Sequence, residues 1–273
     1  MDFRVLGPVG LLADGEMKVL HGARQRTLLA LLLINSGDVV AKAKIFEELW
    51  GGEPPIGADN ALQALVTRFR RVLRNSFDED FARQCLVTRP DGYAMYVDPE
   101  TIDVRVFERL ITQAREKLRS EPELAWSLLD QALALWQGPA LQGATGGPIC
   151  HSAAEQFEEA RLAATEDLIR VKIAIRGHAS VISELKSLSF RHPWRERLAE
   201  LLMVCLYRAG RQAEAIQTYN HVRCRLVTEF GMEPSPSLKR CMTAILNQDP
   251  ALGGDRSMGV RNPLPRALVP VSA

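Results

Sequence analysis

The sequence has no excess of either charge and no cysteine pattern that would define a disulfide framework. Its 34 Lys and Arg residues stand against 33 Asp and Glu residues, a formal net charge of +1. The charge of the whole molecule therefore gives no sign of a polyanionic partner, and any surface for one must be local. The five cysteines are odd in number and include no CxxC pair, which argues against disulfide scaffolds and zinc ribbons and favours a reducing compartment.

Long apolar segments and a secretory leader are also missing. The longest apolar run, Leu28–Ile34, is too short to span a bilayer. No basic stretch leads into an apolar region at the N-terminus. We therefore expect a cytoplasmic protein without a membrane partner. At 273 residues, 47% of them apolar, the chain is long enough for two ordinary domains.

Catalytic motifs are missing as well. No segment resembles a nucleophile elbow, a paired-carboxylate motif or a dinucleotide fingerprint. His221 and Cys224 lie one helical turn apart, a spacing that could ligate a metal, but a structural zinc site needs four ligands. The sequence favours a protein that is not an enzyme and has no metal or cofactor.

The first hundred residues contain two signals for β-hairpins. Short strand-like segments flank Asp14–Gly15, a dipeptide that tolerates positive φ in a tight turn. Near residue 90, β-branched and aromatic residues flank Pro90–Gly92, which is a second hairpin signature. Both ends of this region are therefore expected to be β-structure.

Three helices are expected between these hairpins. The segment from Ala23 is apolar almost all round and should be central to a small core. A short amphipathic helix follows, "AKAKIFEELW", and two glycines stop it. A third helix covers residues 60–75, with Asp59 as its N-cap. This order predicts a winged helix-turn-helix module with an extra N-terminal sheet over residues 1–98.

Beyond Pro99 the strand signals vanish and helices are expected to about residue 247. Gly210, Ala215 and Tyr219 have the spacing of a tetratricopeptide-type helical hairpin, and weaker copies precede them. We expect an all-α domain of degenerate repeats over residues 99–247. Residues 248–273 are rich in Gly and Pro without a period, which predicts a disordered tail.

The third helix combines an apolar face with a basic face. At 3.6 residues per turn, one half of residues 60–75 is apolar and is expected to pack against the core. The other half has four arginines within the stretch and no acid to pair with them, which is unusual for a solvated helix. Asn, Gln and Arg are also the side chains that read base edges in the major groove. The DNA-facing residues predicted on this helix are Asn60, Gln63, Thr67, Arg68, Arg70, Arg71 and Arg74.

Three further basic residues are candidates for DNA contact. Arg89, beside the proline at the hairpin tip, suits a wing that reaches the DNA backbone or minor groove. An exposed turn arginine explains Arg89 equally well. Lys42 and Lys44, at the start of the second helix, could anchor phosphates, although solvated lysines explain them more simply.

Several segments in the same order are similar to one known family. They are "FRVLGPV", "RQRTLLALLLINSGDVV", "IFEELWGGEPP", "LQALVTRFRRVL", "VTRPDGYAMYVDPETIDVRVFERL" and the long stretch from "HPWRERLAELLMVCLYRAGRQ" to "MEPSPSLKR". Together they resemble the Streptomyces antibiotic regulatory proteins of the small, two-domain type. The resemblance covers nearly the whole chain apart from the tail.

The resemblance implies a fold, a function and partners. The fold is mainly α with a small β component: an OmpR-like winged helix-turn-helix domain followed by a tetratricopeptide-like bacterial transcriptional activation domain. Family members activate secondary-metabolite gene clusters. They bind direct repeats near the promoter −35 region as a head-to-tail pair, and they recruit RNA polymerase through σ region 4 and the α C-terminal domain.

Carried over to this sequence, residues 60–74 form the recognition helix and residues 88–93 the wing. Longer family members add nucleotide-hydrolysing domains, but this sequence has no GxxxxGK[ST] loop. It also has no receiver domain, so control by aspartyl phosphorylation is not expected.

Two other readings remain open. A repressor would use the same DNA chemistry, and the residues alone do not distinguish it from an activator. A helical-repeat adaptor would bind protein through its N-terminal domain, and the arginine face argues against that reading. A salt-dependent gel shift separates an adaptor from both DNA-binding alternatives.

Overall fold

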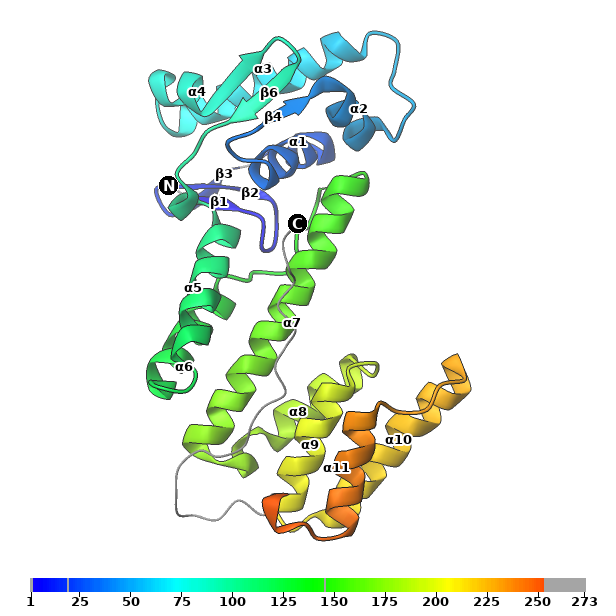
Figure 1. Ribbon diagram of the computed structural model, residues 1–273. Coiled ribbons are helices and arrows are strands. Elements are labelled where there is room, and N and C mark those ends of the chain that lie inside the picture. The colour runs from blue at the N-terminus through cyan, green and yellow to red at the C-terminus, as the bar shows by residue number, and fades with distance from the viewer. Residues whose placement is uncertain (1, 19, 145, 253–273) are drawn as a thin grey trace, which may run out of the picture. The chain divides into compact units, whose positions relative to one another are not determined.

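The computed structural model describes residues 2–18, 20–144 and 146–252, which fall into two compact units that divide between Ile175 and Arg176 (Figure 1). Both units are mainly helical. Within the described residues, strands occur only in the first unit. The expected fold class, mainly α with a small β component, is confirmed.

The N-terminal sheet is an antiparallel meander in the order β1–β2–β3. Its strands are β1 (Asp2–Arg4), β2 (Gly10–Ala13) and β3 (Glu16–Lys18). Asp14 and Gly15, between β2 and β3, have φ of 55° and 77°. Both central residues of this two-residue turn thus have the positive φ that matches the twist of a hairpin, and the predicted turn is confirmed.

The winged helix-turn-helix follows this sheet. Its elements are α1 (Ala23–Ile34), β4 (Val39–Ala41), α2 (Lys42–Trp50), α3 (Ala58–Ser76), α4 (Glu79–Cys85), β5 (Leu86–Arg89) and β6 (Gly92–Met95). A second antiparallel sheet has the order β4–β6–β5. The three predicted helices and the second hairpin are confirmed, whereas β4 and α4 are elements that the sequence analysis did not predict.

Helix α1 is the centre of the first unit's core. The six consecutive side chains from Leu28 to Leu33 are at most 1% exposed. A helix buried on all sides carries apolar residues all round instead of along one stripe. The sequence expectation for this helix is therefore confirmed.

Helices α5 (Asp103–Lys117), α6 (Pro122–Ala134) and α7 (Pro148–Arg176) come next, after the short 3-10 helix η1 (Pro99–Thr101). The carboxylate of Asp103 accepts hydrogen bonds from the backbone N–H groups of Val5 and Leu6, each at 3.0 Å. The N–H of Leu141 donates to Val5 O at 2.8 Å. These contacts are part of the packing by which α5, α6 and α7 lie in one compact unit with the winged module, up to Ile175.

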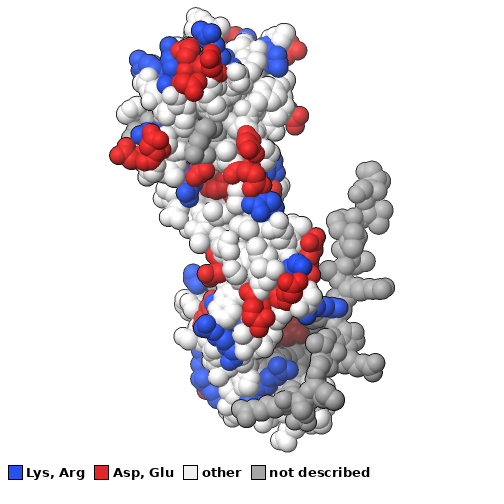
Figure 2. All heavy atoms as spheres, turned by 90° about the vertical axis from the view of Figure 1, so that its left-hand side faces the viewer, with Lys and Arg blue, Asp and Glu red and all other residues white. Residues whose placement is uncertain are grey.

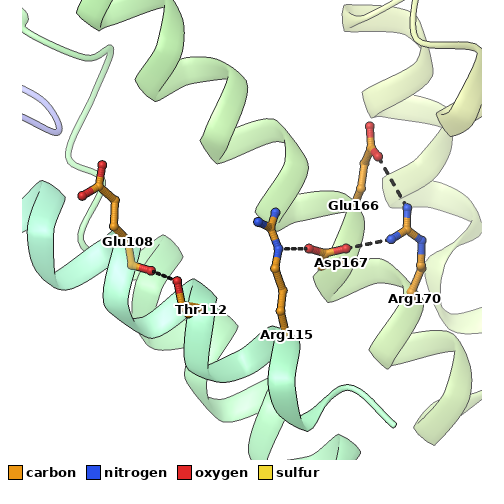
Figure 3. A network of polar contacts seen from close by, with 6 residues as sticks. All are labelled: Glu108, Thr112, Arg115, Glu166, Asp167 and Arg170. Carbon is orange, nitrogen blue, oxygen red and sulfur yellow. Dashed lines mark hydrogen bonds and ion pairs between the residues drawn. The ribbon is translucent and has the colours of Figure 1, made fainter. Parts of the chain in front are cut away.

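Charged side chains join α5 to α7 inside this unit (Figure 3). Arg115 Nε on α5 lies 2.9 Å from Asp167 Oδ2 on α7. Arg170 contacts Asp167 at 2.7 Å and Glu166 at 3.6 Å from the next turn of α7. Asp167 and Glu166 are 7% and 5% exposed, and buried charges of this kind require partners.

The second unit is a set of antiparallel helices. Its elements are η2 (His178–Val181), α8 (Ile182–Arg191), α9 (Glu196–Arg208), α10 (Gln212–Phe230), α11 (Pro236–Leu246) and η3 (Pro250–Leu252). Gly210, with φ of 73°, makes the turn between α9 and α10. Leu206 and Ala215 on either side are both 0% exposed, so the helical hairpin expected here is confirmed.

The predicted tail lies mostly outside the described residues, which end at Leu252. The prediction of disorder is wrong for residues 250–252, which form η3. This turn is held because Arg208 Nε donates to Leu252 O at 2.7 Å and Asp249 caps the turn through the N–H of Ala251 at 2.9 Å. None of the described helices has the length and hydropathy needed to cross a bilayer.

Candidate nucleic-acid interface

The helix-turn-helix consists of α2, a glycine-bounded loop and α3. Gly51, with φ of 64°, closes α2, and Gly57, with φ of 80°, precedes the first residue of α3. Asp59 is therefore not the N-cap, and that prediction is wrong. Gly57 takes the cap position because it adopts the left-handed backbone conformation. Asp59 lies in the first turn, where its charge favours the helix dipole.

The apolar face of α3 is buried as the sequence period predicts. Leu62, Val66, Phe69 and Leu73 are between 0% and 2% exposed. Leu65 and Val72 flank them and are partly buried. The 3.6-residue period thus fixes which side of α3 faces away from the core.

The opposite face of α3 is exposed to solvent. Five of the predicted DNA-facing residues are exposed and have no hydrogen bond or ion pair with the part of the chain that the structure describes. They are Asn60, Gln63, Thr67, Arg68 and Arg71. A row of unpaired amide, hydroxyl and guanidinium groups on one helix face is the donor and acceptor set that major-groove readout requires.

The expectation that no acid pairs with the arginines is wrong for Arg74, and Arg70 has internal partners. Arg74 Nε lies 3.1 Å from Glu79 Oε2 on α4, an element the sequence analysis missed. Arg70 Nη2 donates to Leu86 O at 2.9 Å and to Thr88 Oγ1 at 2.8 Å. Arg70 therefore ties α3 to β5 at the base of the wing.

The wing is the hairpin of β5 and β6, with Pro90 and Asp91 at its tip. A Cβ atom at Gly92 would lie 2.0 Å from Val40 O, so only glycine lets β6 pair this closely with β4. Arg89 is exposed, its guanidinium lies 5.8 Å from the ring centroid of Tyr96, and its Nη2 lies 3.4 Å from the tyrosine hydroxyl. Arg89 thus stands on the outer surface of the wing.

The two candidate lysines of α2 have different surroundings. Lys42 Nζ lies 3.0 Å from Asp59 Oδ1, and the hydrogen bond and charge of Asp59 raise the pKa of Lys42. This pair joins the first turns of α2 and α3. Lys44 is exposed and has no partner among the residues described.

Glu48 is a residue of this module that the sequence analysis missed. Its side chain is 2% exposed and accepts hydrogen bonds from the backbone N–H groups of Ile149 and Cys150, at the start of α7. The helical period could have predicted its burial, because Glu48 follows Ile45 by three residues and therefore lies on the buried face of α2. An acid on that face needs a buried donor.

Charge on the surface is local. The face drawn in Figure 2 carries small groups of basic and acidic side chains, without one sign prevailing. This agrees with the net charge of +1. An interface for a polyanion therefore depends on particular side chains, such as the exposed arginines of α3, and not on the field of the whole molecule.

Comparison with known proteins gives a matching family model for each half of the chain. Residues 16–95 match the family model described as "Transcriptional regulatory protein, C terminal", and residues 102–246 match the bacterial transcriptional activator domain. The transcriptional regulator RedD of Streptomyces coelicolor is 40% identical over 92% of this chain and 72% of its own length. The regulatory protein DnrI of Streptomyces peucetius is 33% identical over 92% of this chain and 94% of its own length.

A solved structure has the same fold. Mycobacterium tuberculosis EmbR, in complex with a low-affinity phosphopeptide, superposes with a TM-score of 0.85 at 28% identity, over 92% of this chain and 68% of that one. A winged helix-turn-helix joined to a bacterial transcriptional activator domain defines a class of transcription regulators. Within that class, this chain belongs to the Streptomyces antibiotic regulatory protein family.

Proposed function

We propose that this protein is a sequence-specific DNA-binding activator of a secondary-metabolite, antibiotic-type gene cluster. The observation that carries the proposal is a row of five exposed polar side chains on α3 that have no partner among the described residues: Asn60, Gln63, Thr67, Arg68 and Arg71. A helix whose other face is firmly buried presents such a row as a rigid reading surface, which is how recognition helices enter the major groove.

The chemistry of this face supports a division of roles. Asn60 and Gln63 suit bidentate contacts to adenine, and Arg68 and Arg71 suit guanine or phosphate. Thr67 suits contact with a thymine methyl group. Around them, Lys44, Arg89 and the paired Lys42, Arg70 and Arg74 complete a basic border that suits the phosphate backbone.

Activation requires more than one copy and a second surface. One recognition helix reads only a few base pairs, too few to single out a site in a genome. We therefore propose a head-to-tail pair on direct repeats near the −35 region. DNA recognition is assigned to residues 1–98, and contact with σ region 4 and the α C-terminal domain of RNA polymerase mainly to residues 99–247. The protein would act on the nucleoid in the cytoplasm, by contact and without catalysis.

Two measurements on the promoters of the neighbouring genes test the proposal. A footprint over direct repeats, with affinity that falls as salt rises, is expected for DNA recognition. Transcription in vitro should then rise when the protein is added to purified polymerase. Absence of any DNA binding would favour the adaptor, and a fall in transcription would favour the repressor.

A further inference from the structure

A hollow of about 450 Å³ lies beside the recognition helix, in the first unit. Its lining comes from the first turn of α1, the end of α2 and one flank of α3. Arg24 and Gln25 contribute from α1, Leu49 from α2, and Leu65 and Arg68 from α3. Among the residues that the structure describes, no acid lines it, so these residues give the hollow only positive and neutral groups.

The N-terminus of α1 opens into this hollow without a cap. Gly22 precedes the helix with φ of 93°, no side chain of the described residues caps it, and no acid lies in its first turn. The first N–H groups of a helix have no intrahelical partner, and the helix dipole adds partial positive charge there. A bound anion would accept hydrogen bonds from these N–H groups and would interact favourably with the helix dipole.

Gln25 gives a second and independent indication of a ligand. Its side chain is 3% exposed, and its buried Oε1 has no hydrogen-bond partner. Most buried polar groups are paired, so an unpaired one calls for an explanation. The NH₂ group of the same amide also has no hydrogen bond to the described chain and, unlike Oε1, is not fully shielded from solvent, so Gln25 can donate from this group to an anion in the hollow.

Two arginines complete the site. Arg24 and Arg68 form no hydrogen bond or ion pair within the described residues. The guanidinium of Arg24 lies 5.8 Å from the centroid of Trp50, a ring that supports it from the end of α2. Uncapped N–H groups, an unpaired amide and unpaired guanidinium groups are the donors that bind phosphate in proteins.

We propose that this hollow binds a phosphate group, and that its ligand is a backbone phosphodiester of the DNA read by α3. The inference rests on the proposed function. Arg68 belongs to the same helix as the base-reading side chains, so a phosphate held here lies on the strand that borders the major groove. Arg24 and Gln25 thereby become DNA-contacting residues of α1, and the contact fixes the position of α3 without reading sequence.

The test uses the full chain, a random-sequence duplex and salt between about 50 and 200 mM. Arg24→Gln should lower affinity on the order of tenfold at the low-salt end and flatten the salt slope by about 1. Arg119→Gln is the matched control, because Arg119 is exposed in the same unit and lies outside the winged module. It should leave both quantities unchanged.

Gln25→Leu separates a binding role from a structural one. It removes an unpaired buried amide at similar volume, so the denaturant midpoint should stay level or rise while the affinity for the duplex falls. A lower midpoint together with unchanged affinity would make Gln25 a structural residue and overturn the site.

The remaining outcomes distinguish the site from the function. If the wild-type chain binds the duplex and both variants match Arg119→Gln, the site is wrong and the proposed function stands. If the wild-type chain binds neither this duplex nor the promoter repeats, both are wrong. A comparison of inorganic phosphate with chloride at equal ionic strength tests whether the ligand of the hollow is free phosphate instead of DNA. Thermal stabilisation that Arg24→Gln abolishes, with unchanged duplex binding, would make free phosphate the ligand and overturn the DNA assignment.

Discussion

Glu48 Oε2 on α2 lies 3.3 Å from the backbone nitrogen of Cys150 in the first turn of α7. An acid of the helix-turn-helix therefore caps a helix that begins one hundred residues further along the chain. The loop before α7 approaches α2 closely enough that a Cβ atom at Gly147 would lie 3.0 Å from Cα of Glu48. Glycine at this position lets the cap form.

Glu48→Ala should lower the free energy of unfolding by about 1–3 kcal/mol, because it leaves two backbone N–H groups of α7 without their acceptor. Urea unfolding followed by circular dichroism measures this loss. Glu47→Ala is the control, since Glu47 is exposed on the same helix and should change stability by less than about 0.5 kcal/mol. Equal effects from the two variants would contradict the capping role.

Phe69→Ala should cost about 3–5 kcal/mol, because the ring is 1% exposed and its removal leaves a cavity under α3. Ile56→Ala is the comparison, since Ile56 is fully exposed in the loop before α3 and loses no packing. If Phe69→Ala has the same melting temperature as the wild type, α3 packs a different face against the core.

The sequence predicted α3, both hairpins and the buried α1 because each has a strong local signature. These signatures are a clear 3.6-residue period in α3, the turn-forming residues Asp14–Gly15 and Pro90–Gly92 in the hairpins, and a continuous apolar run in α1. Helix α4 was missed because its seven residues bury only Ala82 and Cys85. Strand β4 has three residues, too few to show alternation. The hydrogen bond between Asp103, at the start of α5, and Val5, just after β1, spans 98 residues, and no local pattern records such a contact.

The candidate site was predictable in its exposed part only. Helical periodicity places Asn60, Gln63 and Thr67 outward, and they lie outward in the structure. The internal partners of Arg70 and Arg74 lie on β5 and α4, which fold back on α3. Spacing within α3 cannot indicate partners that come from other elements.

Arg71→Ala should flatten the salt slope of DNA binding by about 1 if it removes a phosphate contact, or cost about 1–3 kcal/mol at one base position if it removes a base contact. Arg74→Ala should have the smaller effect, because Glu79 already neutralises part of its charge. Gel shifts at several salt concentrations measure both. Normal binding by both variants, with folding intact, would remove α3 from the interface.

The stability of the first unit should depend on the charge of Asp103. Burial raises its pKa from the ordinary value of 3.8 to about 6, and three backbone N–H donors together with the charge of Arg4 oppose the rise. Because the folded pKa is the higher one, the contribution of the protonated acid is complete below about pH 4 and is lost as pH rises through about 6.

The advantage of wild type over Asp103→Asn should therefore shrink by up to about 3 kcal/mol from pH 4 to pH 7. Denaturant unfolding of both proteins across this range measures the difference in their free energies of unfolding. The pH-dependent contributions of the other titratable groups are the same in both proteins and cancel in this difference. An advantage that grows with pH would show that the N–H donors outweigh burial and that Asp103 is ionised throughout.

The last prediction concerns how DNA binding becomes activation. If two copies lie head to tail on direct repeats, their equivalent surfaces face the same side of the duplex only when the repeat spacing is close to a whole number of turns, about 10.5 bp each. Inserting half a turn between the repeats should abolish cooperative binding and activation together, because the second copy then lies on the opposite side of the DNA. Inserting a full turn is the control for distance. It should return the two copies to the same side of the DNA while it lengthens the spacing between the repeats. Binding isotherms and transcription from the same templates give both readouts. Undiminished activation on the half-turn template would mean that one bound copy suffices and that the pair is not the activating unit.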